Sequence, residues 1–145
     1  MKIPFAPLTL GLAGLIPFIW GGVTVVFPEL AILGVDTIGA RFVGPYVQLF
    51  YGAIILSFMS GVLWGFATQS DNPWNYVLSV LPALWAFFMT GGGPTAAAMN
   101  LIAGFLGLIL IDWAMFRQDL TPQWWMPLRV GLTVIVVLSL LTVVI

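Results

Sequence analysis

Residues 44–68 read GPYVQLFYGAIILSFMSGVLWGFAT and carry no charged side chain. An uncharged apolar run of this length is typical of a helix that crosses a lipid bilayer. Within the run, Ser57, Gly61 and Gly65 recur at every fourth position, so their small side chains share one face of the helix. Small residues let the backbone of a neighbouring helix come close. The pattern therefore predicts that this helix lies at the centre of a helical bundle.

The composition places the chain in a membrane rather than in water. Of the 145 residues, 61% are hydrophobic and only 6% are charged, whereas about a quarter of the residues of a soluble domain are charged. The net charge is −1 and no basic patch exists, which excludes nucleic acid as a partner. The chain has no cysteine and no histidine, which excludes disulfides, thiolate or imidazole metal sites and histidine-ligated haem. We therefore expect no metal, no cofactor and a surrounding of membrane lipids.

Five apolar segments are long enough to cross a bilayer, so we expect an all-α integral membrane protein with a bundle of five transmembrane helices. We expect one transmembrane domain over the whole chain. Its predicted spans are residues 7–27, 44–68, 73–89, 95–113 and 127–145. The first segment begins like a signal peptide, but it contains no small-residue cleavage site followed by a polar chain. We therefore expect the first helix to be retained.

Two predicted spans carry a proline near their middle. Pro17 removes a hydrogen bond to the carbonyl of Ala13, and Pro82 frees the carbonyl of Leu78. We expect a kink at each proline, with Ser79 as a substitute partner for the freed carbonyl in the third span. A packing kink is the simpler interpretation of Pro17, and a gating hinge is the alternative.

The segment between the first two spans, residues 28–43, mixes apolar residues irregularly with charged ones. Pro28 and Glu29 suit the start of a helix. Gly34 and Gly39 argue against one long helix, because glycine is a poor helix former. We expect one or two short turns that lie along the membrane interface.

A second face of small residues lies on the predicted span 95–113 and includes Asn100 and Gly104. We expect this face to pack against the small-residue face of the span 44–68, because close packing is what joins helices in lipid. Asn100 is also the most polar residue near the middle of the bilayer. It makes either a hydrogen bond between helices or a contact to a ligand or ion.

Asp112 closes the fourth predicted span and Arg129 opens the fifth, so both lie near the same membrane surface. Trp113 and Trp125 beside them mark the level of the lipid headgroups. A lone charge in the apolar slab is costly, and an arginine binds a carboxylate with two hydrogen bonds. We therefore expect an ion pair that clamps the two helices, and separate access of the two side chains to water is the alternative.

The few positive charges predict an orientation. With five spans, Lys2, Arg117 and Arg129 fall on the side of the N-terminus and Arg41 falls on the other side. Lysine and arginine concentrate in cytoplasmic segments of membrane proteins. We therefore expect the N-terminus in the cytoplasm, or in the matrix of an organelle, and the C-terminus on the opposite side.

Several stretches spread over nearly the whole chain match one family pattern. These stretches are Leu10–Phe18, Tyr51 with Leu56–Phe58, Gly61 with Trp64–Gly65, Pro82, Asp112, and Trp125 with Leu128–Arg129 and Leu132–Thr133. In them the sequence resembles the family of small bacterial and mitochondrial inner-membrane proteins named after transmembrane protein sixty-nine, a domain of unknown function. The resemblance implies a multi-span inner-membrane protein and supplies no reaction.

We expect a non-enzymatic protein that acts as an accessory or assembly subunit of a larger inner-membrane complex. The glycine-rich faces offer surface for other integral membrane subunits or for self-association, and no two of the five carboxylates form a catalytic motif. The alternative is a small transporter or channel in which Ser57 and Asn100 line a polar path. Against that alternative, no carboxylate or lysine lies in mid-membrane and no internal repeat is visible.

Overall fold

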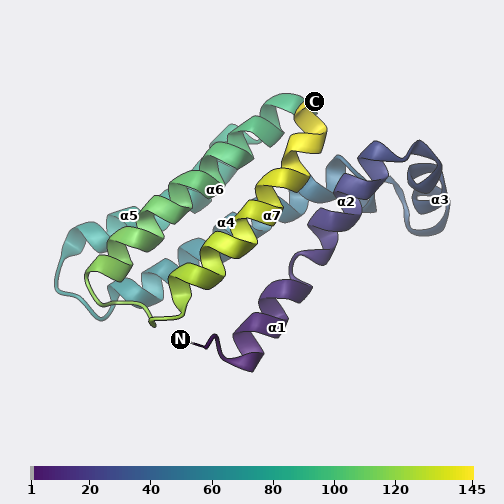
Figure 1. Ribbon diagram of the computed structural model, residues 1–145. Helices are drawn as coiled ribbons and strands as arrows, with labels where there is room; N and C mark the ends of the chain where they lie inside the picture. Colours follow the sequence, from purple (N-terminus) through teal and green to yellow (C-terminus); the bar gives the residue numbers. More distant parts are fainter. Residues whose placement is uncertain (1) are drawn as a thin grey trace.

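The computed structural model describes residues 2–145, and in this range the chain is helical without a strand, which confirms the all-α expectation (Figure 1). An apolar chain without water around it must satisfy its backbone internally, and helices do so within each segment. The elements are α1 (Phe5–Ala13), α2 (Ile16–Val26), α3 (Pro28–Ile38), the 3-10 turn η1 (Ala40–Phe42), α4 (Tyr46–Ala67), α5 (Pro73–Met89), α6 (Pro94–Arg117) and α7 (Trp125–Val144).

Helices α4 to α7 run side by side, and α3 is turned aside at one end of the bundle (Figure 1). α4 packs against α5, α6 and α2, while α7 packs against α6, α2 and α1. The core lies between these helices and is built from apolar side chains of all of them except α1 and α3. Its largest fully buried members are Phe18, Leu56, Leu63, Leu101, Phe105, Leu108, Met115 and Leu140.

Four helical stretches are long and apolar enough to cross a membrane: α1 with α2, then α4, α6 and α7. α5 has only 17 residues, which is the lower limit for a spanning helix. The described residues thus support a membrane protein with four spans, and the predicted fifth crossing is not established. The helix ends also differ from the predicted span ends, since α6 continues to Arg117 and α7 begins at Trp125. Asp112 therefore lies inside α6 rather than at its end.

The first predicted span is two helices rather than one kinked helix. α1 ends at Ala13, Gly14 and Leu15 form a turn, and α2 begins with Pro17 as its second residue. Proline cannot donate the hydrogen bond that would continue α1, and its ring excludes the carbonyl four residues earlier. The break falls at the position expected for the kink and is more complete than a kink.

Residues 28–43 form a longer helix than the short turns predicted. α3 runs for 11 residues through Gly34, which is buried rather than disruptive. An added Cβ on Gly34 would lie 3.3 Å from Cζ2 of Trp20 and would meet Val43, so this glycine is needed for close contact. α3 ends at Ile38, and the next residue, Gly39, has a φ of 98°, which favours glycine. Trp20 Nε1 then donates a hydrogen bond to the carbonyl of Phe42, 2.8 Å away.

Pro82 lies inside α5 without ending it. The expected rescue by Ser79 is wrong, because its hydroxyl donates to the carbonyl of Tyr76 at 2.7 Å. The serine that forms a hydrogen bond next to Pro82 belongs to α4 instead. Ser60 Oγ accepts a hydrogen bond from the backbone N–H of Ala83, 2.8 Å away. A side chain of one helix thus satisfies a donor next to the proline of its neighbour.

Candidate functional site

The predicted packing face of α4 is turned away from the rest of the chain. Ser57, Gly61 and Gly65 are all exposed, and an added Cβ on either glycine would meet no atom within 4 Å. The Ser57 hydroxyl donates to the carbonyl of Ala53 in its own helix, 2.9 Å away. The prediction that this face packs against α6 is therefore wrong. We call Ser57, Gly61 and Gly65 the outer stripe.

A different face of α4 makes the close contacts. Gly52 lies against Leu101 of α6, and Leu56 lies against Gly104, where an added Cβ would be 2.9 Å from Leu56 Cδ1. The Cβ added at Gly104 would also lie 2.8 Å from Cδ1 of Trp85 in α5. Of the two residues predicted on the α6 side, Gly104 does mediate close packing with α4, whereas Asn100 bonds to α5. The partner of Gly104 is Leu56 rather than the outer stripe.

Asn100 makes the interhelical hydrogen bond that was one of its two expected roles. Its Nδ2 donates to the carbonyl of Met89 at the end of α5, 2.8 Å away. The carbonyl of Asn100 in turn accepts a hydrogen bond from Trp85 Nε1 at 2.6 Å. Asn100 is therefore engaged in joining α5 to α6.

The expected ion pair between Asp112 and Arg129 is present. Arg129 Nε lies 3.0 Å from Asp112 Oδ2, and the two residues come from α6 and α7. Asp112 is fully buried and Arg129 is 5% exposed, so the pair is deeper than the surface position predicted. Trp125 Nε1 donates to the second carboxylate oxygen, Oδ1, at 2.8 Å. Sequence reasoning placed Trp125 at the headgroups and missed this role.

Two polar atoms next to the ion pair have no hydrogen-bond partner. They are Nη2 of Arg129 and Oγ1 of Thr133, and both are buried. Thr133 follows Arg129 by four residues in α7, so the two side chains lie on the same helix face. Buried polar groups are normally paired, so an unpaired donor of this kind calls for an explanation. Two sequence signals pointed to Thr133: its i, i+4 spacing from Arg129, and its place in the stretch Leu132–Thr133 that carries the family resemblance.

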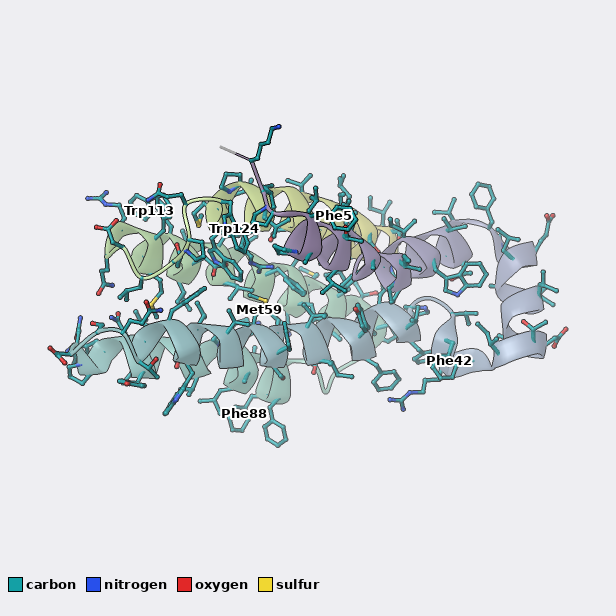
Figure 2. All side chains as sticks on the ribbon, turned by 90° about the horizontal axis from the view of Figure 1, so that it is seen from below. Phe5, Phe42, Met59, Phe88, Trp113 and Trp124 are labelled. Carbon is teal, nitrogen blue, oxygen red and sulfur yellow. The ribbon has the colours of Figure 1, made fainter. Side chains whose placement is uncertain are left out.

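These two residues line a cavity of about 400 Å³ between α1, α2, α4, α6 and α7. Most of the wall is apolar, and five aromatic residues contribute to it: Phe18, Tyr51, Phe58, Phe105 and Trp125. The Phe18 ring meets the Tyr51 ring edge to face, with centroids 5.3 Å apart. Met59 forms part of the wall, and Figure 2 shows it inside the bundle. An apolar cavity with a few convergent polar groups is the usual form of a small-molecule site.

The rim of this cavity consists of residues that are exposed on the outside of the bundle. Leu10 of α1 and Phe58 of α4 both line the cavity, and they are 72% and 65% exposed. α1 itself has no buried residue. The cavity therefore opens sideways between α1 and α4, toward the medium around the apolar faces. We call this cavity the arginine cavity.

A second polar cluster lies farther along the bundle, toward the end near η1. Gln48 Nε2 donates to the carbonyl and to the hydroxyl of Ser139, at 2.8 and 2.9 Å. The Ser139 hydroxyl donates to the carbonyl of Phe18 at 2.5 Å. The cluster joins α4, α7 and α2. Gln48 and Ser139 do not line the arginine cavity, and we interpret the cluster as a structural clamp that sequence reasoning missed.

Comparison with known proteins assigns a family to this bundle. The model of a family described as "Protein of unknown function (DUF3429)" matches residues 3–145. The chain is 37% identical over 150 residues to a protein named Transmembrane protein 69 from Xenopus tropicalis, covering 94% of this chain and 53% of the relative. It is 32% identical over 143 residues to a protein of the same name from Mus musculus, covering 94% of this chain and 54% of the relative.

The chain thus spans about half the length of the curated relatives it matches. No solved structure gives a significant match. The family match extends over almost the whole chain and agrees with the resemblance found in the sequence motifs. The chain therefore belongs to the DUF3429 family and is similar to proteins named Transmembrane protein 69.

Proposed function

We propose that this protein is a non-enzymatic accessory or assembly subunit of a larger complex in the inner membrane. The observation that carries the proposal is the outer stripe of α4. Ser57, Gly61 and Gly65 make a smooth face that the chain's own packing does not use. Lipid tails solvate an apolar helix as well as another helix does, so helices associate through close packing at small residues. The outer stripe offers such a surface to a helix of another subunit.

The buried carboxylate supports a non-enzymatic role. Both oxygens of Asp112 already accept hydrogen bonds, one from Arg129 and one from Trp125. The remaining carboxylates of the described chain are exposed and lie at helix ends or in turns: Glu29, Asp36, Asp71 and Asp119. A general acid or base needs a partner group in a cleft, and these residues are separate from one another.

We further propose five crossings, with the N-terminus in the cytoplasm and the C-terminus opposite. α5 meets the lower length limit for a span, and its neighbours α4 and α6 are both long and apolar enough to span. The sequence argument for the orientation counted Arg129 among the positive charges on the side of the N-terminus. Arg129 no longer counts there, because it is paired with Asp112 inside the bundle. Lys2 and Arg117 remain exposed on one side, against Arg41 on the other. This excess still favours a cytoplasmic N-terminus.

Two contacts count against the transporter alternative. Ser57, which was expected to line a polar path, faces outward and bonds to its own helix. Asn100, the other expected lining residue, bonds to the carbonyl of Met89. Neither side chain is available to line a path through the bundle.

Substitution at the outer stripe tests the accessory role. Gly61→Leu should leave the isolated protein folded, because an added side chain there meets no atom of the chain. It should abolish the larger species seen for the native protein on native gels in mild detergent, and the subunits that copurify with it. Gly131→Leu is the matched control, because Gly131 lies on α7 in equally open space. A native protein that always migrates alone, or an assembly unaffected by Gly61→Leu, would contradict the proposal.

A further inference from the structure

We propose that the arginine cavity binds a neutral membrane lipid whose head is a flat ring bearing a carbonyl group, in the manner of a quinone, and whose tail is apolar. The proposal concerns binding only. It is independent of the accessory function, because the cavity and the outer stripe use different faces of α4. Each can therefore fail without the other.

The first reason is the pair of donors without partners. Arg129 uses Nε for Asp112, which leaves Nη2 buried and unpaired. Thr133 Oγ1 is equally buried, and its hydroxyl hydrogen has no acceptor among the described residues. Leaving a buried polar group unpaired costs free energy, because the group has lost its hydrogen bonds to water. A carbonyl oxygen in the cavity would accept from both residues and remove this cost.

The second reason is charge. Asp112 and Arg129 already neutralise each other at 3.0 Å. An anionic headgroup would add a net negative charge inside an apolar bundle, which is expensive. A neutral carbonyl accepts the same hydrogen bonds without that cost. The acceptor that this site favours is therefore uncharged.

The third reason is shape. Phe18, Tyr51, Phe105 and Trp125 all line the cavity, and aromatic walls stack well on a flat ring. The volume of about 400 Å³ falls within the range of small-molecule sites. The opening between Leu10 and Phe58 lets a long apolar tail extend into the surrounding lipid. The cavity thus fits a ring inside and a tail outside.

Removing the Thr133 hydroxyl tests the assignment. The purified native protein in detergent is titrated with a benzoquinone that carries a short isoprenoid tail, and Kd is obtained from the ligand-dependent rise in Tm. Thr133→Val keeps the shape of the side chain and removes the donor. We expect its Kd to be about three- to tenfold higher, as for one lost hydrogen bond. Its Tm without ligand should be unchanged or higher, because no internal hydrogen bond is lost.

Two further variants keep the test interpretable. Thr133→Ser retains the hydroxyl and should bind within about twofold of the native protein. Thr95→Val is the matched control, because Thr95 is exposed at the start of α6 and does not line the cavity. If Thr133→Val does not fold, Thr133→Ala provides the same loss of the donor with a smaller side chain.

Two competing ligands test which kind of headgroup supplies the oxygen that accepts from Arg129 and Thr133. A monoacylglycerol presents an uncharged ester carbonyl without a ring, and palmitate presents an anionic head. Saturable binding of the quinone that depends on Thr133 supports the proposal. Tighter binding of the monoacylglycerol would contradict the inference that the headgroup is a flat ring. Tighter binding of palmitate would contradict the inference that the headgroup is neutral. Equal quinone affinity in the native protein and Thr133→Val, or no saturable binding, would overturn the site.

Discussion

At the scale of single residues, the ion pair inside the bundle is held by three side chains. Asp112 accepts one hydrogen bond from Arg129 and one from Trp125, so neither carboxylate oxygen is left bare. Removing two charges from water is expensive, and their attraction repays the cost only when the remaining polar atoms are also satisfied. The carboxylate meets this condition fully, whereas the guanidinium keeps one buried nitrogen, Nη2, without a hydrogen-bond partner. The acidic partner is therefore the better stabilised of the two.

Breaking the pair should destabilise the fold. Asp112→Asn leaves the Arg129 cation buried without its counter-charge, and we expect a loss of about 3–5 kcal/mol in unfolding free energy. Thermal unfolding in detergent, followed by tryptophan fluorescence, measures this loss as a lower Tm. Asp119→Asn is the control, because Asp119 is exposed and its φ of 57° also suits asparagine.

Replacing both charges should cost much less than replacing one. In Asp112→Leu combined with Arg129→Met, the pair becomes apolar at similar volume, and no charge is left unpaired. We expect the double variant to recover most of the Tm that Asp112→Asn loses. A double variant less stable than Asp112→Asn would show that the pair stabilises the bundle through more than mutual neutralisation.

At the scale of the helix, α5 shows how a proline is accommodated in an apolar bundle. Pro82 interrupts the hydrogen-bond ladder of α5, and Ser60 of α4 accepts the N–H of Ala83. In lipid no water is present to take the place of that serine. The contact therefore ties α4 to α5 at the point where α5 is weakest on its own.

Removing this acceptor should weaken the contact between α4 and α5. Ser60→Ala leaves the Ala83 N–H without a partner, and we expect a loss of about 1–3 kcal/mol in unfolding free energy. Ser57→Ala is a matched control three residues away, because the Ser57 hydroxyl bonds only within its own helix and is exposed. Equal effects of the two substitutions on Tm would contradict the role of Ser60.

The glycines of α6 should differ sharply in their tolerance of a side chain. An added Cβ at Gly104 would lie within 3.0 Å of both Trp85 and Leu56, whereas at Gly107 it would meet nothing within 4 Å. We expect Gly104→Ala to lower the unfolding free energy by about 1–3 kcal/mol through overpacking. Gly107→Ala should be neutral or slightly stabilising, because alanine is the better helix former. Tm values of the two variants in the same detergent test this difference.

The sequence identified the helices well but placed the inner face of α4 wrongly. α4 carries no charge and is apolar on every side, so no polar face indicates which side is buried. Ser57, Gly61 and Gly65 form a regular small-residue face, but the face of Gly52, Leu56 and Ser60 contacts the other helices. A chain in lipid offers two possible packing faces here, and only the neighbouring helices decide between them.

At the scale of the whole molecule, the number of crossings determines on which side each connection lies. Five crossings place the turn after α4 and the connection after α6 on the same side as the N-terminus. They place the turn after α5 on the other side, together with α3. If α5 did not cross, the turns before and after it would lie on one side.

The absence of cysteine makes this arrangement directly testable. Asp71→Cys and Gln123→Cys lie in the turns before α5 and α7, and Gly92→Cys lies in the turn after α5, all at exposed positions. With the proposed five crossings and orientation, a membrane-impermeant maleimide applied to sealed membrane vesicles should label the first two from the cytoplasmic side and Gly92→Cys from the opposite side. Labelling of Asp71→Cys and Gly92→Cys from the same side would exclude the fifth crossing.

The sequence predicted the ion pair of the candidate site but not the cavity around it. Asp112 and Arg129 were apparent because charges are rare in this chain and lie near the ends of neighbouring spans. The cavity depends on α1, whose position follows from the break at Gly14 and Leu15 rather than from any contact pattern in the sequence. The unpaired Thr133 hydroxyl could not be predicted from the sequence either. Threonines in apolar helices commonly bond to their own backbone, so the expected state of this hydroxyl is a paired one.

The contacts of the first two helices have a consequence for how the protein is made. α1 and α2 are synthesised about 100 residues before α7, yet both pack against it. At about 5–20 residues per second, the ribosome needs roughly ten seconds to extend the chain from α2 to α7. During that interval the nascent N-terminal helices wait in the bilayer without one of their partners. Translation speed between α2 and α7 therefore sets how long they are exposed to membrane proteases and insertion factors.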